Sequence, residues 1–152
     1  MRMPTAKSED LRLILAEGEG QKVEFKEGLG RLDREMVAFA NATGGSVFLG
    51  VNDHSQVIGL HITNELKSRI QDIARNCDPP IPVSLRAFPD GVLEIIVKEG
   101  SDKPHQCREG FFLRNGPNCQ KLTREQIAQI VLTTGAYHFD ETINERFRFP
   151  AD

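Results

Sequence analysis

The chain has 152 residues, of which 39% are hydrophobic and 27% charged, and its formal net charge at pH 7 is -3. This length suits one domain, and the composition is that of a folded globular protein. The mild acidity argues against a uniformly basic, histone-like coat on nucleic acid, but it allows a local basic patch. The longest apolar runs fall far short of the ~20 residues of a membrane span, which favours a cytoplasmic location.

The N-terminal segment predicts a helix followed by a strand. The helix is expected from Ser8 to about Ala16, with two glycines just beyond its end. Val23 and Phe25 then alternate with charged residues, which is the period of a half-buried strand. Glu24 belongs to the charged face of this strand and is expected to point away from the core.

The next two elements predict a parallel crossover. Apolar residues recur at helical spacing from about Arg31 to Thr43, and two glycines supply a stop. The almost continuously apolar run Ser46–Val51 predicts a strand that is covered on both faces, at the centre of the sheet. A strand, a helix and a strand over this length are typical of a right-handed βαβ unit.

Turn chemistry dominates the middle of the chain. The sequence Asn52–Ser55 predicts a hairpin that returns through a short strand at Gln56–Leu60. A third helix, capped by Thr63 or Asn64, is expected to end at Asp78, which precedes two prolines.

The C-terminal half predicts more strands and one more helix. Val83–Phe88 and Val92–Lys98 flank a Pro-Asp-Gly turn and predict a second hairpin. Phe111–Arg114 predicts a further short strand, and Thr123–Gln126 is a capping box that opens a last helix running to Gly135. The expected fold class is therefore α+β, with a mixed sheet, a βαβ crossover and β-hairpins packed against helices.

The residues after Gly135 show no clean hydrophobic period. We expect residues 1–135 to form the domain and residues 136–152 to be a linker or docking tail that leads to a further C-terminal part.

The cysteines predict neither a disulfide framework nor a standard zinc site. Cys77, Cys107 and Cys119 are odd in number and form no CxxC pair, so we expect reduced packing residues. A metal held by His105, Cys107 and Cys119 is the alternative.

Three carboxylates form a candidate site. Glu24 and Asp53 lie near the ends of the two parallel strands, which share one edge of the sheet, and Glu19 would join them if the chain bends at Gly18 and Gly20. Three converging carboxylates would suit Mg²⁺ or Mn²⁺. Spacing alone favours the other interpretation, a solvated strand face with a salt-bridged Glu24.

Basic residues supply candidate contacts to phosphate groups. The residues that we expect to bind nucleic acid gather around the second helix and the Phe111–Arg114 strand. They are Lys22, Lys26, Arg31, Arg34, Arg114 and Lys121, with Arg108 and Arg124 as further candidates.

Ordered sequence pieces carry a family resemblance. They read VEFKE, AFANATGGSVFLGVND, VIGL and DKPHQCREGFFLRNGPNCQKLTREQI, and they cover about Glu17 to Val131. This series resembles the Schlafen AlbA-like domain, also called the divergent AAA-type DNA-binding domain. Despite that second name, the chain has no GxxxxGK[ST] motif, so we expect no ATP binding.

The resemblance implies a fold of the Alba type, at the N-terminus of a bacterial transcriptional regulator. In vertebrate Schlafen nucleases, two glutamates five residues apart and a later aspartate form a metal-dependent endoribonuclease site, and Glu19, Glu24 and Asp53 match them. Those nucleases join two such lobes, so this single lobe would have to form a homodimer.

Three functional hypotheses follow. The first is a module that binds DNA or RNA, mainly through phosphates. The second is an Mg²⁺- or Mn²⁺-dependent endoribonuclease with Glu19, Glu24 and Asp53 as catalytic residues and metal ligands. The third is an interaction domain that dimerises. The sequence leaves open whether the protein is an enzyme.

Overall fold

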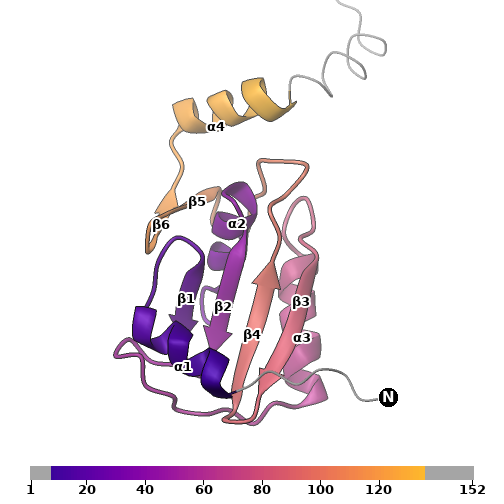
Figure 1. The fold of residues 1–152 in the computed structure, drawn as a ribbon. Helices are drawn as coiled ribbons and strands as arrows, with labels where there is room; N and C mark the ends of the chain where they lie inside the picture. The colour runs from indigo at the N-terminus through magenta and orange to yellow at the C-terminus, as the bar shows by residue number, and fades with distance from the viewer. Residues whose placement is uncertain (1–7, 136–152) are drawn as a thin grey trace, which may run out of the picture.

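The computed structural model describes residues 8–135. They form a four-stranded mixed sheet in the order β1-β2-β4-β3, a separate β5-β6 hairpin and four α-helices (Figure 1). The strands are β1 (Val23–Lys26), β2 (Gly45–Leu49), β3 (Val83–Phe88), β4 (Val92–Val97), β5 (Phe112–Asn115) and β6 (Asn118–Lys121). The helices are α1 (Ser8–Glu17), α2 (Leu32–Asn41), α3 (Asn64–Arg75) and α4 (Arg124–Ile130), which continues into the π-helical turn η1 (Val131–Gly135).

The predicted crossover and hairpin are confirmed. β1 and β2 are parallel and are joined by α2, and β3 and β4 form an antiparallel hairpin. β2 lies between β1 and β4, at the centre of the sheet, as its apolar sequence predicted. The fold class is therefore α+β, as expected.

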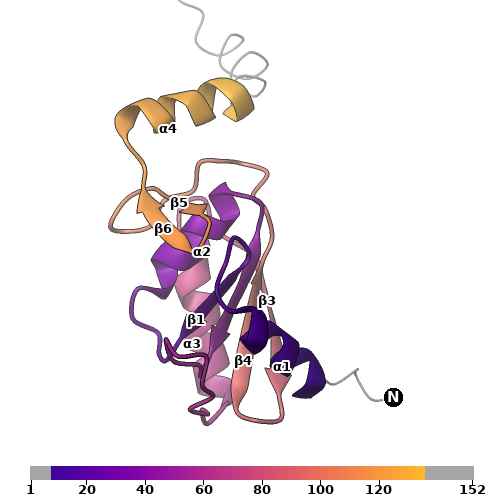
Figure 2. The same cartoon turned by 60° about the vertical axis from the view of Figure 1, so that its left-hand side comes forward.

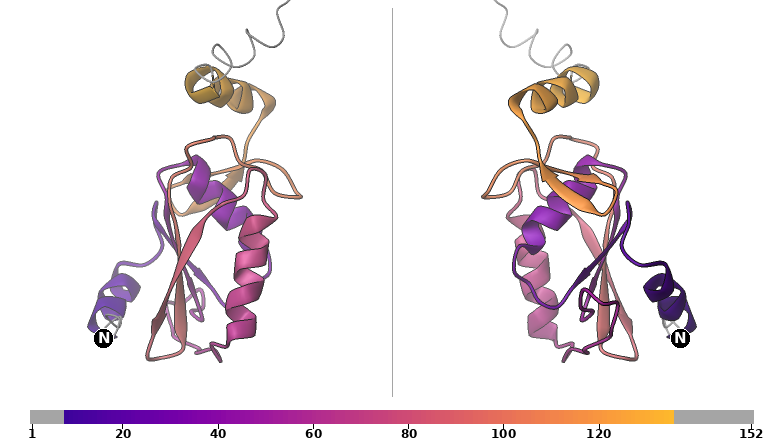
Figure 3. Two further views of the ribbon diagram at one scale, coloured as in Figure 1. Left: turned by 90° about the vertical axis from the view of Figure 1, so that its right-hand side faces the viewer. Right: turned by 90° about the vertical axis from the view of Figure 1, so that its left-hand side faces the viewer.

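Two apolar layers hold the helices on the sheet. α1 covers one face, and α2 and α3 cover the other (Figure 3). The α2 and α3 side contains the larger cluster, with Met36 and Phe39 of α2 against Leu93 and Ile95 of β4. Each such fully buried side chain contributes about 1.5–3 kcal/mol relative to exposure.

The layer under α1 is smaller and rich in phenylalanine. Leu11 of α1 packs with Phe25 of β1, Phe48 of β2 and Phe88 of β3. The rings of Phe25 and Phe48 meet edge to face, with 6.4 Å between their centroids. Strand residues alternate between the two faces of a sheet. Phe25 therefore turns toward α1, and Glu24 turns toward α2.

Helix α2 is shorter than expected at both ends. Arg31 has a φ of 61°, in the left-handed region, so the helix begins after it. At the other end, the buried Asn41 side chain binds a different segment: its Nδ2 donates to the carbonyls of His105 and Phe112, and its Oδ1 accepts from the His105 N–H. Asn41 therefore fastens α2 to the chain that leads into β5.

The predicted strand at Gln56–Leu60 was wrong. Val51 and Val57 form an isolated bridge there, flanked by backbone hydrogen bonds from Asn52 to Gln56 and from Ile58 to Gly50, but no strand forms. The segment folds back on residues 50–52, just past the end of β2, and then leaves this pairing, because the Leu60 N–H donates to the Gly91 carbonyl instead.

The C-terminal elements stand apart from the sheet. β5 begins one residue later than predicted, and the sequence analysis missed β6, its antiparallel partner. The predicted capping box is confirmed, because the Thr123 hydroxyl accepts from the Gln126 N–H and the Gln126 side chain accepts from the Thr123 N–H. α4 has no buried residue and projects beyond the hairpin (Figure 2).

No helix within residues 8–135 is long and apolar enough to cross a membrane. The predicted linker or docking tail, residues 136–152, lies outside the described residues.

Candidate functional site

Arg114 is the centre of a buried charged group. Strand β5 turns Phe112 and Arg114 inward, and the Arg114 side chain has 0% exposure. Its Nε and Nη2 donate to the carbonyl of Gly20 at 3.1 and 2.8 Å, and its Nη2 also donates to the carbonyl of Val23 at 2.7 Å. The guanidinium lies 4.8 Å from the centroid of the Phe39 ring.

Three glutamates surround this arginine. Nη1 of Arg114 donates to Glu24 Oε1 at 2.5 Å and to Glu35 Oε1 at 3.2 Å. Glu19 turns toward β1, where its Oε2 accepts from the Phe25 N–H at 3.0 Å. We call these residues, Glu19, Glu24, Glu35 and Arg114, the carboxylate cluster.

The chain bends before β1 as the cluster requires. Gly18 has a φ of 81°, a conformation that favours glycine, and the bend returns Glu19 to the side of Glu24. Gln21 ties this bend to the hairpin, because its side chain donates to the Arg114 carbonyl and accepts from the Gly116 N–H. The bend that would bring Glu19 to Glu24 is therefore present.

Burial raises the pKa of Glu24 to about 8 and also raises the pKa of Glu35. Arg114 opposes this shift for both carboxyls. The carboxyl of Glu19 adds to the increase at Glu24. Two carboxylates close together repel each other, which favours the protonated form of Glu24.

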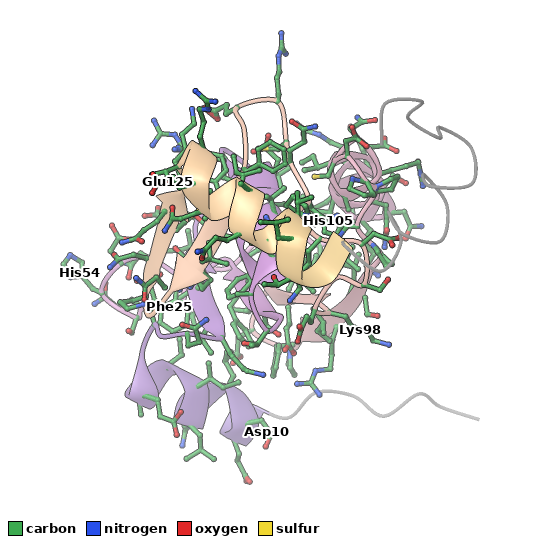
Figure 4. The ribbon with its side chains drawn as sticks, turned by 90° about the horizontal axis from the view of Figure 1, so that it is seen from above. Asp10, Phe25, His54, Lys98, His105 and Glu125 are labelled. Carbon is green, nitrogen blue, oxygen red and sulfur yellow. The ribbon has the colours of Figure 1, made fainter. Side chains whose placement is uncertain are left out.

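Asp53 does not join the cluster. It is exposed in the turn after β2, in which the Asn52 side chain accepts from the N–H groups of His54 and Gln56. His54, its neighbour in sequence, lies at the periphery of the molecule (Figure 4). Asp53 follows Val47, the β2 partner of Glu24, by six residues, which carries it beyond the end of the sheet.

The arrangement does not fit a divalent metal ion. Within residues 8–135, no group of three or more His, Cys, Asp and Glu side chains could hold one. Glu24 faces the guanidinium of Arg114, whose positive charge disfavours a second cation, and the raised pKa of Glu24 favours its neutral form. The predicted set is thus divided: Glu19 and the half-buried Glu24 lie together beside β1, and Asp53 is separate and exposed.

The predicted solvated face of β1 also needs correction. Glu24 is salt-bridged, but its side chain is only 17% exposed, because Arg114 of β5 lies against it. Glu35 was missed by the sequence analysis. The signal for it is its helical i, i+4 spacing with Phe39, which places both side chains beside Arg114.

The predicted basic residues fall into three settings. Arg114 is buried and its donors are engaged within the protein, so its role is different from the expected direct contact with nucleic acid. Lys26 and Arg34 are half-buried. The exposed ones are Lys22, Arg31, Arg108, Lys121 and Arg124.

Four of these cations lie close together. Arg34 stacks 4.7 Å from the Phe112 ring centroid, and its Nε lies 3.8 Å from a carboxylate oxygen of Glu109. Lys121 lies over Gly110, where a Cβ would meet its Cε at 3.2 Å. Arg31 precedes Arg34 by one turn, and Arg108 adjoins Glu109. We call Arg31, Arg34, Arg108 and Lys121 the basic surface.

Comparisons with known proteins agree with this fold. The family model described as Schlafen, AlbA_2 matches residues 19–123, more than half of the chain. The DIP2311 protein from Corynebacterium diphtheriae is similar in structure, with a TM-score of 0.59 and 21% identity; the match covers 83% of this chain and 32% of that one. The present chain thus spans about a third of that protein.

A second similar structure is the N-terminal domain of a protein from Nitrosomonas europaea that is described as related to the ATP-dependent DNA helicase RecG. Its TM-score is 0.52 and its identity 20%, and the match covers 82% of this chain and 93% of that one. No curated protein matches the chain.

Proposed function

The chain belongs to the Schlafen, AlbA_2 family, and on that premise we propose that it is a nucleic-acid-binding module of a transcriptional-regulator-like protein. The family match supports a nucleic-acid-related role. The similar N-terminal domain from Nitrosomonas europaea also supports it, because it comes from a protein described as related to a DNA helicase. The basic surface supplies the binding groups.

The observation that carries the proposal is the convergence of three separate segments on the basic surface. Arg31 and Arg34 come from the start of α2, Arg108 from the turn before β5, and Lys121 from the end of β6. The Cys119 thiol of β6 lies 3.6 Å from the Arg34 carbonyl, which brings β6 against α2. A local group of cations can bind phosphate although the whole chain is acidic.

The two arginines of α2 have different roles on this surface. Arg34 is held by Phe112 and Glu109, so its position is fixed before a ligand arrives. Arg31 is exposed and sits in a left-handed turn ahead of the helix. Contacts of this kind recognise the backbone rather than base sequence, so we expect weak binding that depends strongly on salt.

Binding is tested with labelled duplex DNA, single-stranded DNA and an RNA hairpin, each titrated with the protein at low salt and then at increasing salt. We expect binding that weakens linearly on a plot of log affinity against log salt concentration. Undetectable binding to all three probes at low salt would overturn the proposal.

Two extensions of the sequence analysis are tested on the same samples. Light scattering at each protein concentration reports whether binding requires a homodimer. Denaturing gels with Mn²⁺ or EDTA report cleavage by the predicted endoribonuclease, which we do not propose here because the carboxylates do not fit a metal ion.

A further inference from the structure

Cys77 and Cys107 belong to two antiparallel segments that are joined by an isolated β-bridge. Asp78 and Gln106 form a β-bridge in which each N–H donates to the other's carbonyl at 2.8 Å. One residue further along, the His105 ring contacts the Pro79 carbonyl, with 2.8 Å between His105 Nδ1 and that oxygen. The same register sets Cys77 opposite Cys107.

This register places the two thiols at a non-hydrogen-bonded position. The backbone N–H and carbonyl of Cys107 are bonded to Gly110, which leaves them turned away from Cys77, as such a position requires. Opposed residues of this kind have Cα atoms about 4.5 Å apart, and a disulfide needs about 4.4–6.8 Å. From this general spacing we expect the two Cα atoms to lie within the range that a disulfide needs.

The side chains meet in one cavity. Cys77 and Cys107 both line a pocket of about 340 Å³, together with Leu29, Asp33 and Arg108. Each is a free thiol, and both belong to the same buried cluster. The exposed guanidinium of Arg108 at this pocket favours small anionic reagents.

We propose that Cys77 and Cys107 are a redox pair that closes to an intrachain disulfide by exchange with a small, carboxylate-bearing disulfide such as glutathione disulfide. One cysteine thiolate attacks a sulfur of the reagent, forms a mixed disulfide and releases one small thiol. The second cysteine loses its proton, attacks the first cysteine's sulfur and releases the second small thiol. Two protein thiols are oxidised, and one small disulfide is reduced to two thiols.

Cys107 makes the first attack, because it adjoins Arg108, whose exposed guanidinium at the pocket attracts the anionic reagent. Burial raises the pKa of both thiols, that of Cys77 to about 12. Backbone hydrogen bonds at Glu109 and Gly110 oppose the increase at Cys107. Because only the thiolate attacks, closure becomes faster as the pH rises.

Closure would connect α3 to the segment that enters β5. Cys77 follows the last turn of α3, and Cys107 lies two residues after His105, which Asn41 of α2 already holds. The disulfide would close a loop of about 30 residues, so we expect the thermal midpoint of the oxidised protein to rise by about 5 °C or more.

The test treats the folded protein with glutathione disulfide at mildly alkaline pH, followed by thiol titration and peptide mapping. We expect the number of free thiols to fall from three to one, with a cross-link between the peptides that contain Cys77 and Cys107. Cys119→Ala is the matched control and should form the same cross-link, leaving no free thiol. Cys77→Ser should instead retain one glutathione as a mixed disulfide on Cys107.

Three outcomes would overturn the inference. They are three free thiols after prolonged treatment at alkaline pH, a map that joins Cys119 to either partner, and a cross-link between two chains. Peptide mapping of the oxidised parent protein shows whether the Cys77–Cys107 cross-link forms, even where a variant fails to fold.

Discussion

The carboxylate cluster and the basic surface lie around the same β5-β6 hairpin, yet they use charged residues in opposite ways. In the cluster, Arg114 is fully buried, and its donors bind two glutamates and two backbone carbonyls. On the basic surface, Arg31, Arg108 and Lys121 are exposed. The comparison teaches that burial and partners, rather than residue type, separate a charge that holds the fold from a charge that is free to bind a ligand.

The largest effect is expected from Arg114→Met, which removes the cation of the cluster. We predict a loss of about 3–5 kcal/mol in the free energy of unfolding, because buried carboxyls and two backbone carbonyls lose their donor. Urea denaturation measures it.

Arg75→Met is the matched control, since Arg75 forms an exposed pair with Asp72 and should change stability by less than about 0.5 kcal/mol. Equal effects of the two substitutions would erase the distinction between buried and exposed arginines.

A smaller effect is expected from Glu24→Gln, and its sign depends on pH. The pKa of Glu24 is raised from 4.5 in the unfolded chain to about 8 in the fold. The protonated carboxyl therefore stabilises the fold fully below pH 4.5, and this contribution is lost as the pH rises through about 8. Glutamine stays neutral. The variant should match the parent near pH 4.5 and exceed it by about 1–2 kcal/mol at pH 9.

Denaturation at both pH values measures this difference. Glu27→Gln, at an exposed position next to β1, should leave the pH dependence unchanged. A Glu24→Gln protein that is less stable than the parent at pH 9 would show that the ionised carboxylate, and not the protonated one, is the favoured state of the cluster.

The smallest effects are expected from Lys121→Ala and Arg108→Ala on the basic surface. Each should weaken nucleic-acid binding by about two- to five-fold and reduce the salt slope by about 1, while unfolding stays within about 0.5 kcal/mol of the parent. Fluorescence anisotropy over a series of salt concentrations measures both quantities. If either substitution destabilised the fold by several kcal/mol, the substituted residue would be one that holds the fold, as Arg114 does, and not one that is free to bind a ligand.

The sequence predicted the elements whose patterns are local. The alternation in β1, the apolar run of β2 and the Pro89–Gly91 turn each predict their own structure, and all three are confirmed. Gln56–Leu60 failed because its pairing stops after one bridge, and Leu60 instead bonds to Gly91 in the turn between β3 and β4, a long-range contact that no local pattern shows.

The site was less accessible to sequence reasoning. Glu19 and Glu24 were found because they are near in sequence, but Glu35 is separated from Arg114 by 79 positions, and no local pattern joins them. Asp53 was grouped with them from its place after a parallel strand, although the turn carries it away from the cluster. The burial of Arg114 likewise depends on the hairpin packing against α2, a long-range contact.

The central claim is tested most directly by the double charge reversal Arg108→Glu and Lys121→Glu, compared with Arg69→Glu on the exposed side of α3. Affinity for the labelled duplex and RNA hairpin is measured at low salt, and stability is measured on the same preparations. The account predicts a folded double variant whose affinity falls at least about ten-fold, while the Arg69→Glu control stays within about two-fold of the parent. Equal losses in the double variant and the control would contradict it, because binding would then follow net charge and not the basic surface.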